Sequence, residues 1–246
     1  MNELRRRLVV ALPLICLAAQ ARAGLAGLLD KVTGQAGRVH IILIDDTGSI
    51  TDVDRGLYRD AAAADLKTAK PGDRLVVARI SDAKLGGFRA AEDALLPNSG
   101  KHYDDLAKGK KARASATTAV EALLVPVKGG KETRILDVIS ALEPLIAEAT
   151  GRKQQVRLLM LTDGIEETRE VNMATSTVDD AWTNKVMATR QRANLLPKLQ
   201  GIEVYMVGGG GRTATQVKAI EAFWTRYWST TGAQLKFYGR TVPTLE

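Results

Sequence analysis

Three oxygen-bearing side chains follow one apolar run near the start of the chain. Residues 41–44 (IILI) are typical of a buried strand, and the polar sequence DDTGS follows them at once. Asp45, Thr47 and Ser49 have the spacing D-x-T-x-S, so a tight turn containing Gly48 can bring their three oxygens to one point. Because hard oxygen ligands suit small divalent cations, this stretch indicates a site for an ion such as Mg²⁺.

This turn resembles the first loop of the metal-ion-dependent adhesion site (MIDAS) of von Willebrand factor type A (vWA) domains. In that family a Thr on a second loop, commonly within T-x-L-x-D-A-I, and an Asp on a third loop, commonly within T-D-G, complete the site. Here Thr133 lies in TRILDVI and Asp163 lies in LLMLTDG. The resemblance covers about residues 36–239 and implies a vWA domain of the exported bacterial type.

The resemblance implies five metal ligands. The hydroxyls would bind the ion directly, and the carboxylates would bind it directly or through water. Mg²⁺ is the expected ion, with Mn²⁺ and Ca²⁺ as alternatives. Because neutral hydroxyls leave the cation only partly neutralised, an Asp or Glu of another protein could complete the coordination, as is typical of the family. The five residues are Asp45, Thr47, Ser49, Thr133 and Asp163.

Other polar and aromatic residues are expected to support the site or to have structural roles. Asp46 should lie behind the metal ligands or in solvent, and Asp137 should hold a neighbouring loop by hydrogen bonds. Glu166 and Glu167 are expected in a solvated loop, although they could tune affinity for a positively charged partner, and His40 in the core. Four aromatic residues near the end of the chain have helical spacing, which favours core packing: Phe223, Trp224, Tyr227 and Trp228.

Alternating strands and helices must position these loops. We expect strands at 41–44, 75–80, 88–95, 156–161, 202–207 and 235–238, and helices at 51–69, within 103–124, at 135–146, at 178–199 and after Thr213. This alternation predicts an α/β fold with a doubly wound, mostly parallel central sheet and helices on both faces. The short link before 88–95 predicts an antiparallel edge strand. The result is the Rossmann-like fold that the vWA resemblance implies, with Asp45 and Asp163 at strand carboxyl ends, where ligands bind.

The first 23 residues have the pattern of a secretory signal peptide. Three arginines, Arg5 to Arg7, precede an apolar run at 8–19, and Ala21-Arg22-Ala23 offers a cleavage site. The run is short for a bilayer span, so an uncleaved anchor is the alternative. We therefore expect a periplasmic or secreted protein with no stable membrane span after cleavage.

The rest of the chain is expected to form one domain. Residues 24–37 are predicted to be a leader helix and 38–246 the vWA-like domain, with an insertion at about 97–130. Within the insertion, the basic run 107–113 (AKGKKAR) is interpreted as a solvated face or mobile loop. A docking patch for an acidic partner is the alternative.

Charge and cysteine content exclude several classes of function. The net charge is +7, but residues 1–23 carry four Arg and one Glu, so cleavage would leave +4. This charge, without a recognisable reader motif, does not indicate nucleic-acid binding. The single cysteine, Cys16, lies in the signal sequence, so the mature chain would have no disulfide, zinc–thiolate site or catalytic thiol.

The sequence does not indicate an enzyme. Only two histidines are present, His40 and His102, and no Ser–His–Asp set is evident. The glycine run 208–211 lacks the Lys and the spacing of a phosphate-binding loop. We therefore expect a metal-dependent module that binds an acidic residue of a partner protein. The main alternative is a metal-independent vWA-like part of an envelope or secretion assembly. A Mg²⁺-dependent phosphoryl-transfer enzyme is a further alternative, and no pattern indicates an oligomeric state.

Signal cleavage makes a prediction that intact-mass spectrometry can check. Protein collected after export should begin at Gly24, because the small residues Ala21 and Ala23 suit signal peptidase. A mass that includes residues 1–23 would instead show that the segment is retained as an anchor.

Overall fold

The computed structural model describes residues 37–80, 89–125 and 132–245. The expected signal peptide lies outside the described residues, as does the expected leader apart from Gly37. The same holds for parts of the expected hairpin (81–88) and insertion (126–131).

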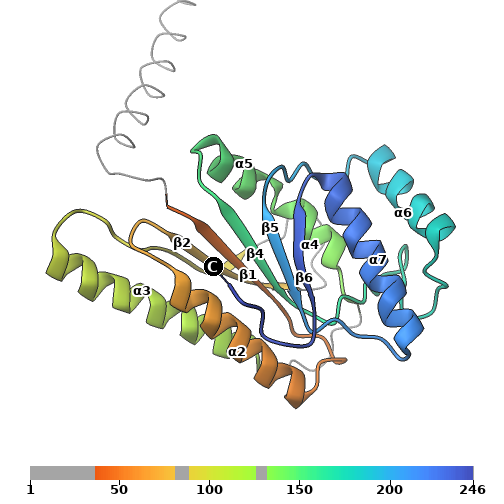
Figure 1. Ribbon diagram of the computed structural model, residues 1–246, viewed down its shortest axis with the longest axis horizontal. Helices are drawn as coiled ribbons and strands as arrows, with labels where there is room; N and C mark the ends of the chain where they lie inside the picture. Colours follow the sequence, from red (N-terminus) through yellow and green to blue (C-terminus); the bar gives the residue numbers. More distant parts are fainter. Residues whose placement is uncertain (1–36, 81–88, 126–131, 246) are drawn as a thin grey trace, which may run out of the picture. The chain divides into compact units, whose positions relative to one another are not determined.

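A six-stranded sheet forms the centre of the described chain (Figure 1). The strand order is β3-β2-β1-β4-β5-β6, and all neighbours are parallel except β2 and β3. The mostly parallel sheet with one antiparallel edge strand confirms the predicted fold class. The strands are β1 (Val39–Asp45), β2 (Arg74–Ile80), β3 (Ala90–Leu95), β4 (Val156–Leu161), β5 (Glu203–Val207) and β6 (Gln234–Gly239).

Helices cover both faces of this sheet (Figure 1). One face is covered by α2 (Asp52–Thr68) and α3 (His102–Leu123). The other face is covered by α4 (Ile135–Ala141), α5 (Glu143–Gly151), α6 (Asp180–Arg192) and α7 (Ala214–Thr231). No helix of the described segments combines the length and apolar character that crossing a bilayer requires.

Strand β1 contributes to the cores on both sides of the sheet. All seven of its residues are buried. Ile42 and Ile44 pack in the core under α2 and α3, whereas Ile41 and Leu43 pack in the core under α4 to α7. Burial of each such side chain stabilises the fold by about 1.5–3 kcal/mol. The carboxyl end of β1, where the first loop begins, is therefore held firmly.

Helix α2 begins with a capping box formed by Thr51 and Asp54. The Thr51 hydroxyl accepts a hydrogen bond from the Asp54 amide at 3.2 Å, and the Asp54 carboxylate accepts one from the Thr51 amide at 3.0 Å. This reciprocal pair fixes the point at which the chain leaves the D-x-T-x-S turn and enters the helix.

The helix expected at 135–146 is two helices. It breaks at Leu142, between α4 and α5, and Pro144 lies in the first turn of α5. Proline has no amide hydrogen, so it cannot donate the bond that would continue the first helix through this point. Apolar residues recur at helical spacing through 135–146, and this stripe is buried across the break, because Ile135, Ile139 and Ile146 all pack in one core.

The helix expected at 178–199 is also shorter than predicted. Asp179 caps its start by accepting from the Trp182 amide at 2.7 Å, and the helix ends at Arg192. Asn194 then has a φ of 55°, a left-handed conformation that Asn tolerates better than most residues and that is incompatible with a continuing helix.

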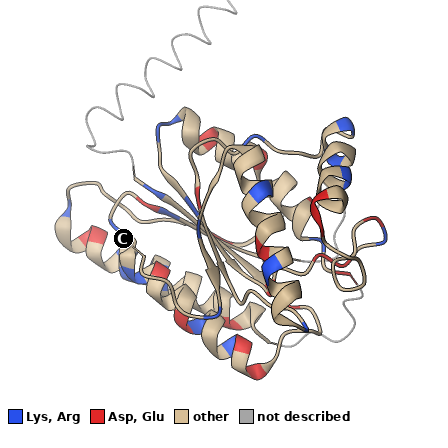
Figure 2. Ribbon diagram, turned by 45° about the vertical axis from the view of Figure 1, so that its right-hand side comes forward, with Lys and Arg blue, Asp and Glu red and all other residues tan. Residues whose placement is uncertain are grey.

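The basic run 107–113 lies within α3, so the interpretation as a solvated face is confirmed and that of a mobile loop is wrong. Lys108, Lys110 and Lys111 are exposed on the helix, whereas Arg113 donates to the carbonyl of Ala69 at 2.8 Å. Figure 2 shows basic and acidic residues interspersed on the helices.

A buried charge network holds the beginning of β1. His40 is 1% exposed, and its two ring nitrogens lie 3.0 Å from Asp65 and 3.3 Å from Asp73. Arg157 on β4 pairs with the other oxygen of Asp65 at 3.1 Å. The prediction that His40 is a core histidine is confirmed. Burial lowers the pKa of His40, but the hydrogen bonds and charges of the two carboxylates outweigh it and raise the pKa above the ordinary 6.5.

This network predicts a pH-dependent contribution to stability. Because the folded-state pKa of His40 is raised, its stabilising effect is complete below pH 6.5 and disappears as pH rises through that pKa. The difference in free energy of unfolding between wild type and His40→Gln should therefore be larger at pH 6 than at pH 9, as measured by urea unfolding.

The matched control is the exposed His102, for which His102→Gln should show no such difference. A gap for His40→Gln that stays constant across this pH range would contradict the assignment.

Candidate metal centre

The first and third loops of the predicted site emerge side by side. Asp45 is the last residue of β1, and Asp163 follows the end of β4. These two strands are parallel neighbours, with Ile44 opposite Leu161. The prediction that both aspartates lie at adjacent strand carboxyl ends is confirmed.

The carboxylate of Asp45 is buried and fully hydrogen-bonded. One oxygen accepts from the amide and the hydroxyl of Thr47, at 3.0 and 2.7 Å. The other accepts from the hydroxyl of Thr162 at 2.7 Å. Thr162 was not predicted as a site residue, although its position directly before Asp163 could have indicated a hydroxyl close to the site. These bonds fix the orientation of the Asp45 carboxylate.

Hydroxyl groups connect the two aspartates. The oxygens of Thr47 and Ser49 lie 3.2 Å apart, and the Ser49 hydroxyl is close enough to the Asp163 carboxylate to lower its pKa. Asp163 also accepts from the amide of Ile165 at 2.9 Å. Four of the five predicted ligands therefore form one continuous set: Asp45, Thr47, Ser49 and Asp163.

The second loop is joined to the third loop by a backbone bridge. The Thr133 amide donates to the Glu167 carbonyl at 3.1 Å, and the Glu167 amide donates to the Thr133 carbonyl at 3.0 Å. This bridge places Thr133 beside the third loop. Within the described residues, the buried Thr133 forms no side-chain hydrogen bond with the other four predicted ligands.

Burial and nearby negative charge raise the pKa values of the two aspartates. For Asp163, burial and then the charge of Asp45 raise the pKa to about 7. The pKa of Asp45 is raised mainly by burial, and the charge of Glu167 adds to the effect. Neither aspartate forms an ion pair with a Lys, Arg or His of the described segments. The site therefore places two carboxyl groups where burial and neighbouring negative charge disfavour the ionised form of both.

The third loop depends on one glycine and one tryptophan. Gly164 has a φ of 78°, which a residue with a side chain rarely adopts. Its carbonyl accepts from the indole nitrogen of Trp224 on α7 at 2.8 Å. Trp224 belongs to the buried aromatic cluster, so the prediction of core packing is confirmed, and the cluster also anchors the loop that carries Asp163.

The oxygen atoms present suit a hard cation. Carboxylates and hydroxyls are the donors that Mg²⁺ and Ca²⁺ prefer. The described part of the chain holds no group of three or more His, Cys, Asp or Glu arranged for a metal, so a site here depends on the hydroxyls. Asp46 lies outside the set and pairs with Arg79 at 3.1 Å.

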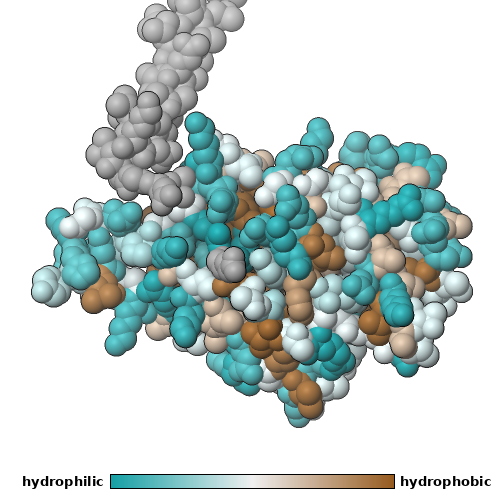
Figure 3. Space-filling view, viewed as in Figure 1, coloured by the Kyte–Doolittle hydropathy of each residue, from teal (hydrophilic) through white to brown (hydrophobic). Residues whose placement is uncertain are grey.

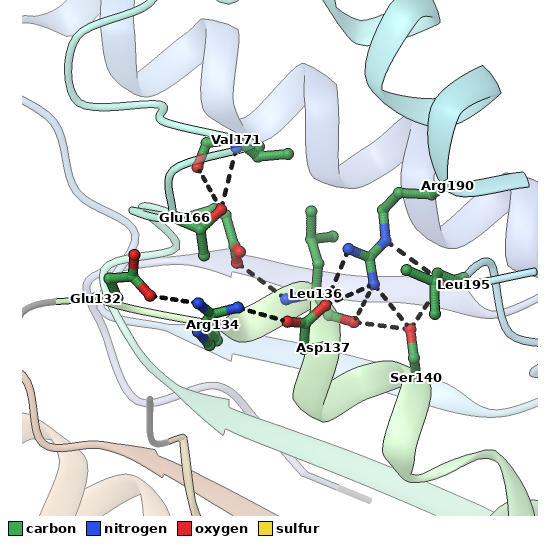
Figure 4. A network of polar contacts seen from close by, with 10 residues as sticks. Glu132, Arg134, Leu136, Asp137, Ser140, Glu166, Val171, Arg190 and Leu195 are labelled. Atoms are coloured by element: carbon green, nitrogen blue, oxygen red, sulfur yellow. Dashed lines mark hydrogen bonds and ion pairs between the residues drawn. The ribbon is translucent and has the colours of Figure 1, made fainter. Parts of the chain in front are cut away.

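Glu166 is a buried structural residue, so the expectation that it lies in a solvated loop is wrong. It is 1% exposed, and its carboxyl group accepts from the Leu136 amide of α4 at 2.9 Å (Figure 4). The loop folds back on itself through a bridge between Glu167 and Asn172, which turns Glu166 inward. Burial raises the pKa of Glu166 to about 8. Glu166 thus ties the third loop to the helix that follows Thr133.

Asp137 holds neighbouring segments together, as predicted. It accepts from Arg134 at 3.2 Å and from Arg190 on α6 at 3.1 Å (Figure 4). Arg190 also donates to the Leu136 carbonyl at 3.0 Å. The start of α4 is therefore fixed to both α6 and the third loop.

Comparisons with known proteins give no family for this chain. No protein-family model matches it, and no curated protein matches it. Among solved structures, it is similar to the PilB minor pilin from Streptococcus sanguinis, with 11% sequence identity and a TM-score of 0.44. The match covers 83% of this chain and 57% of the pilin chain, which is less than two thirds of that protein's length. A likeness at this level supports no argument about function.

The role of Glu166 predicts different effects for two substitutions. Near pH 7 the side chain is largely protonated, so Glu166→Gln keeps its shape and its acceptor oxygen and should unfold like wild type. Glu166→Leu leaves the Leu136 amide buried without a partner and should lower the free energy of unfolding by about 1–3 kcal/mol. Urea unfolding at pH 7 measures both.

The exposed Glu170 in the same loop gives the control, since Glu170→Leu should have little effect. Equal destabilisation by Glu166→Gln and Glu166→Leu would show that the charge of Glu166, not its acceptor oxygen, matters.

Proposed function

We propose that this protein is an exported, metal-dependent protein-binding module with a MIDAS-like site. Mg²⁺ would be held by Asp45, Thr47, Ser49, Thr133 and Asp163, and the bound ion would attract an Asp or Glu side chain of a partner protein. This proposal describes adhesion or assembly and requires no catalytic step. It combines the resemblance to vWA domains with the arrangement of the three loops.

The observation that carries the proposal is the pair of aspartates at adjacent strand ends, Asp45 buried and Asp163 half-buried. The charge of Asp45 raises the pKa of Asp163, and neither aspartate forms an ion pair within the described segments. Burial of like charges is unfavourable unless a cation or protons compensate it. A divalent ion among these oxygens would provide that compensation.

The hydroxyls explain why such an ion would remain available to a partner. Thr47, Ser49 and Thr133 are neutral ligands, and aspartates that bind through water would leave the ion only partly neutralised by direct ligands. Ser49 is exposed at the first loop, which indicates that this side of the site is open. An acidic side chain from outside could therefore approach the ion.

One observation favours a second candidate function. The Asp45 carboxylate is fully hydrogen-bonded by Thr47 and Thr162 in the structure as it stands. The loops could therefore keep their shape without metal, as expected for a metal-independent structural part of an envelope or secretion assembly.

Calorimetric titration with Mg²⁺ and Mn²⁺ separates these two functions. The metal-free wild type should bind one ion saturably, and Asp163→Ala should abolish binding because it removes one of the two anionic ligands. Thr133→Val removes only a hydroxyl and should weaken binding by about tenfold or more.

The control is Asp52→Ala, which removes a carboxylate close to the first loop in sequence whose side chain is 98% exposed, and which should bind metal like wild type. If wild type binds neither ion, the metal-dependent proposal fails and the metal-independent function is favoured. If Asp163→Ala binds as wild type does, the ion lies elsewhere.

A further inference from the structure

A cleft is lined in part by residues that neighbour the candidate ligand Thr133 in the sequence. It has a volume of about 740 Å³ and is bounded by the start of α4, the 166–171 segment and α6. Figure 4 shows the side chains at its inner end, where Arg134, Asp137 and Arg190 meet. The volume lies within the range of about 300–1,000 Å³ that is typical of ligand-binding pockets.

The cleft and the metal centre share two loops. Glu132 and Arg134, the residues on either side of the candidate ligand Thr133, both line the cleft. Glu166, three residues after Asp163, lines it as well. The second and third loops therefore contribute residues both to the candidate metal centre and to the wall of the cleft.

The walls of the cleft include a substantial apolar area. Val171 and Val186 are each 7% exposed, and the half-buried Trp182 and Leu195 complete the apolar lining. By contrast, the face of the molecule in Figure 3 is mostly hydrophilic, with small apolar areas. An apolar side chain of a ligand would find a well-formed environment in the cleft.

The charges at the inner end of the cleft compensate one another. Arg134 pairs with Glu132 and Asp137, and Arg190 pairs with Asp137. Among the rim residues that the structure describes, the exposed Arg169 and Lys185 form no ion pair, and neither does Glu170. Two free positive charges against one negative charge favour an acidic ligand.

We propose that the cleft receives an apolar or aromatic side chain of the same partner segment whose Asp or Glu binds at the metal centre. This inference rests on the proposed function and specifies its partner. The partner is an acidic segment with an apolar residue within about four positions of the metal-binding acid, because each residue of an extended chain spans about 3.3–3.6 Å. In the sequence Thr133 lies between Glu132 and Arg134 of the cleft wall, so a few residues of the partner suffice to reach from the metal centre to the cleft.

A peptide library tests this proposal. Phage-displayed peptides with one fixed Asp among randomised positions would be selected on the purified protein in Mg²⁺, eluted first with EDTA and then with acid, and the two fractions sequenced separately. The recovered peptides should share an apolar or aromatic residue within four positions of the Asp. Their affinities would then be measured on variants of the protein in Mg²⁺.

Two substitutions on α6 form a matched pair. Thr189 is exposed and lines the cleft, so Thr189→Trp should obstruct it and weaken peptide binding by about tenfold or more. Asn184 is exposed on the same helix and does not line the cleft, so Asn184→Trp should bind peptides like wild type. Both variants should bind Mg²⁺ as wild type does, which shows that the metal centre is intact.

Each result separates the cleft from the metal centre. Mg²⁺-dependent peptides without a shared apolar residue, or unchanged affinity in Thr189→Trp, would overturn the cleft and leave the proposed function standing. Binding that resists EDTA but is lost in Thr189→Trp would support the cleft and contradict the metal. Recovery of no Mg²⁺-dependent peptide would contradict both.

Discussion

The structure depends on the placement of two carboxylates, one buried and one half-buried, at the ends of neighbouring parallel strands. Isolated ionised aspartates in this position would be unfavourable, because water is excluded and like charges face each other. The fold tolerates Asp45 and Asp163 because hydroxyls and backbone amides donate to them and because β1 and β4 are buried along their whole length. The buried strands fix the positions of the two carboxylates, and hydrogen bonds from the loops offset only part of the cost of ionising them there.

The three loops are held by contacts of quite different kinds. The capping box of α2 fixes the exit of the first loop, and a backbone bridge between Thr133 and Glu167 fixes the second to the third. The third loop is held by two hydrogen bonds, one from Trp224 to the Gly164 carbonyl and one from the Leu136 amide to Glu166. None of these contacts uses the side-chain oxygen of a candidate ligand, so the loops are held without occupying those oxygens.

Much of this arrangement could be predicted from the sequence, because it follows from local patterns. The apolar runs located the strands, and the positions of Asp45 and Asp163 after two such runs located the centre. The inward turn of Glu166 could not be predicted, because it results from a bridge that folds the loop back on itself. The break at Leu142 could have been predicted from Pro144, but the regular apolar stripe outweighed it in the interpretation. Thr162 acts through a partner 117 residues away, which only the pairing of β1 with β4 brings near.

Because Trp224 donates a hydrogen bond to the Gly164 carbonyl, the intrinsic tryptophan fluorescence of the protein can report on the third loop. The chain has three tryptophans, and two of them are in informative places: Trp224 contacts the loop that carries Asp163, and Trp182 lines the cleft. Indole emission depends on hydrogen bonding and on exposure to water. The third tryptophan, Trp228, is buried against Met206, where it supplies a steady background. A rearrangement of the third loop or an occupant in the cleft would therefore change the intrinsic fluorescence without any attached label.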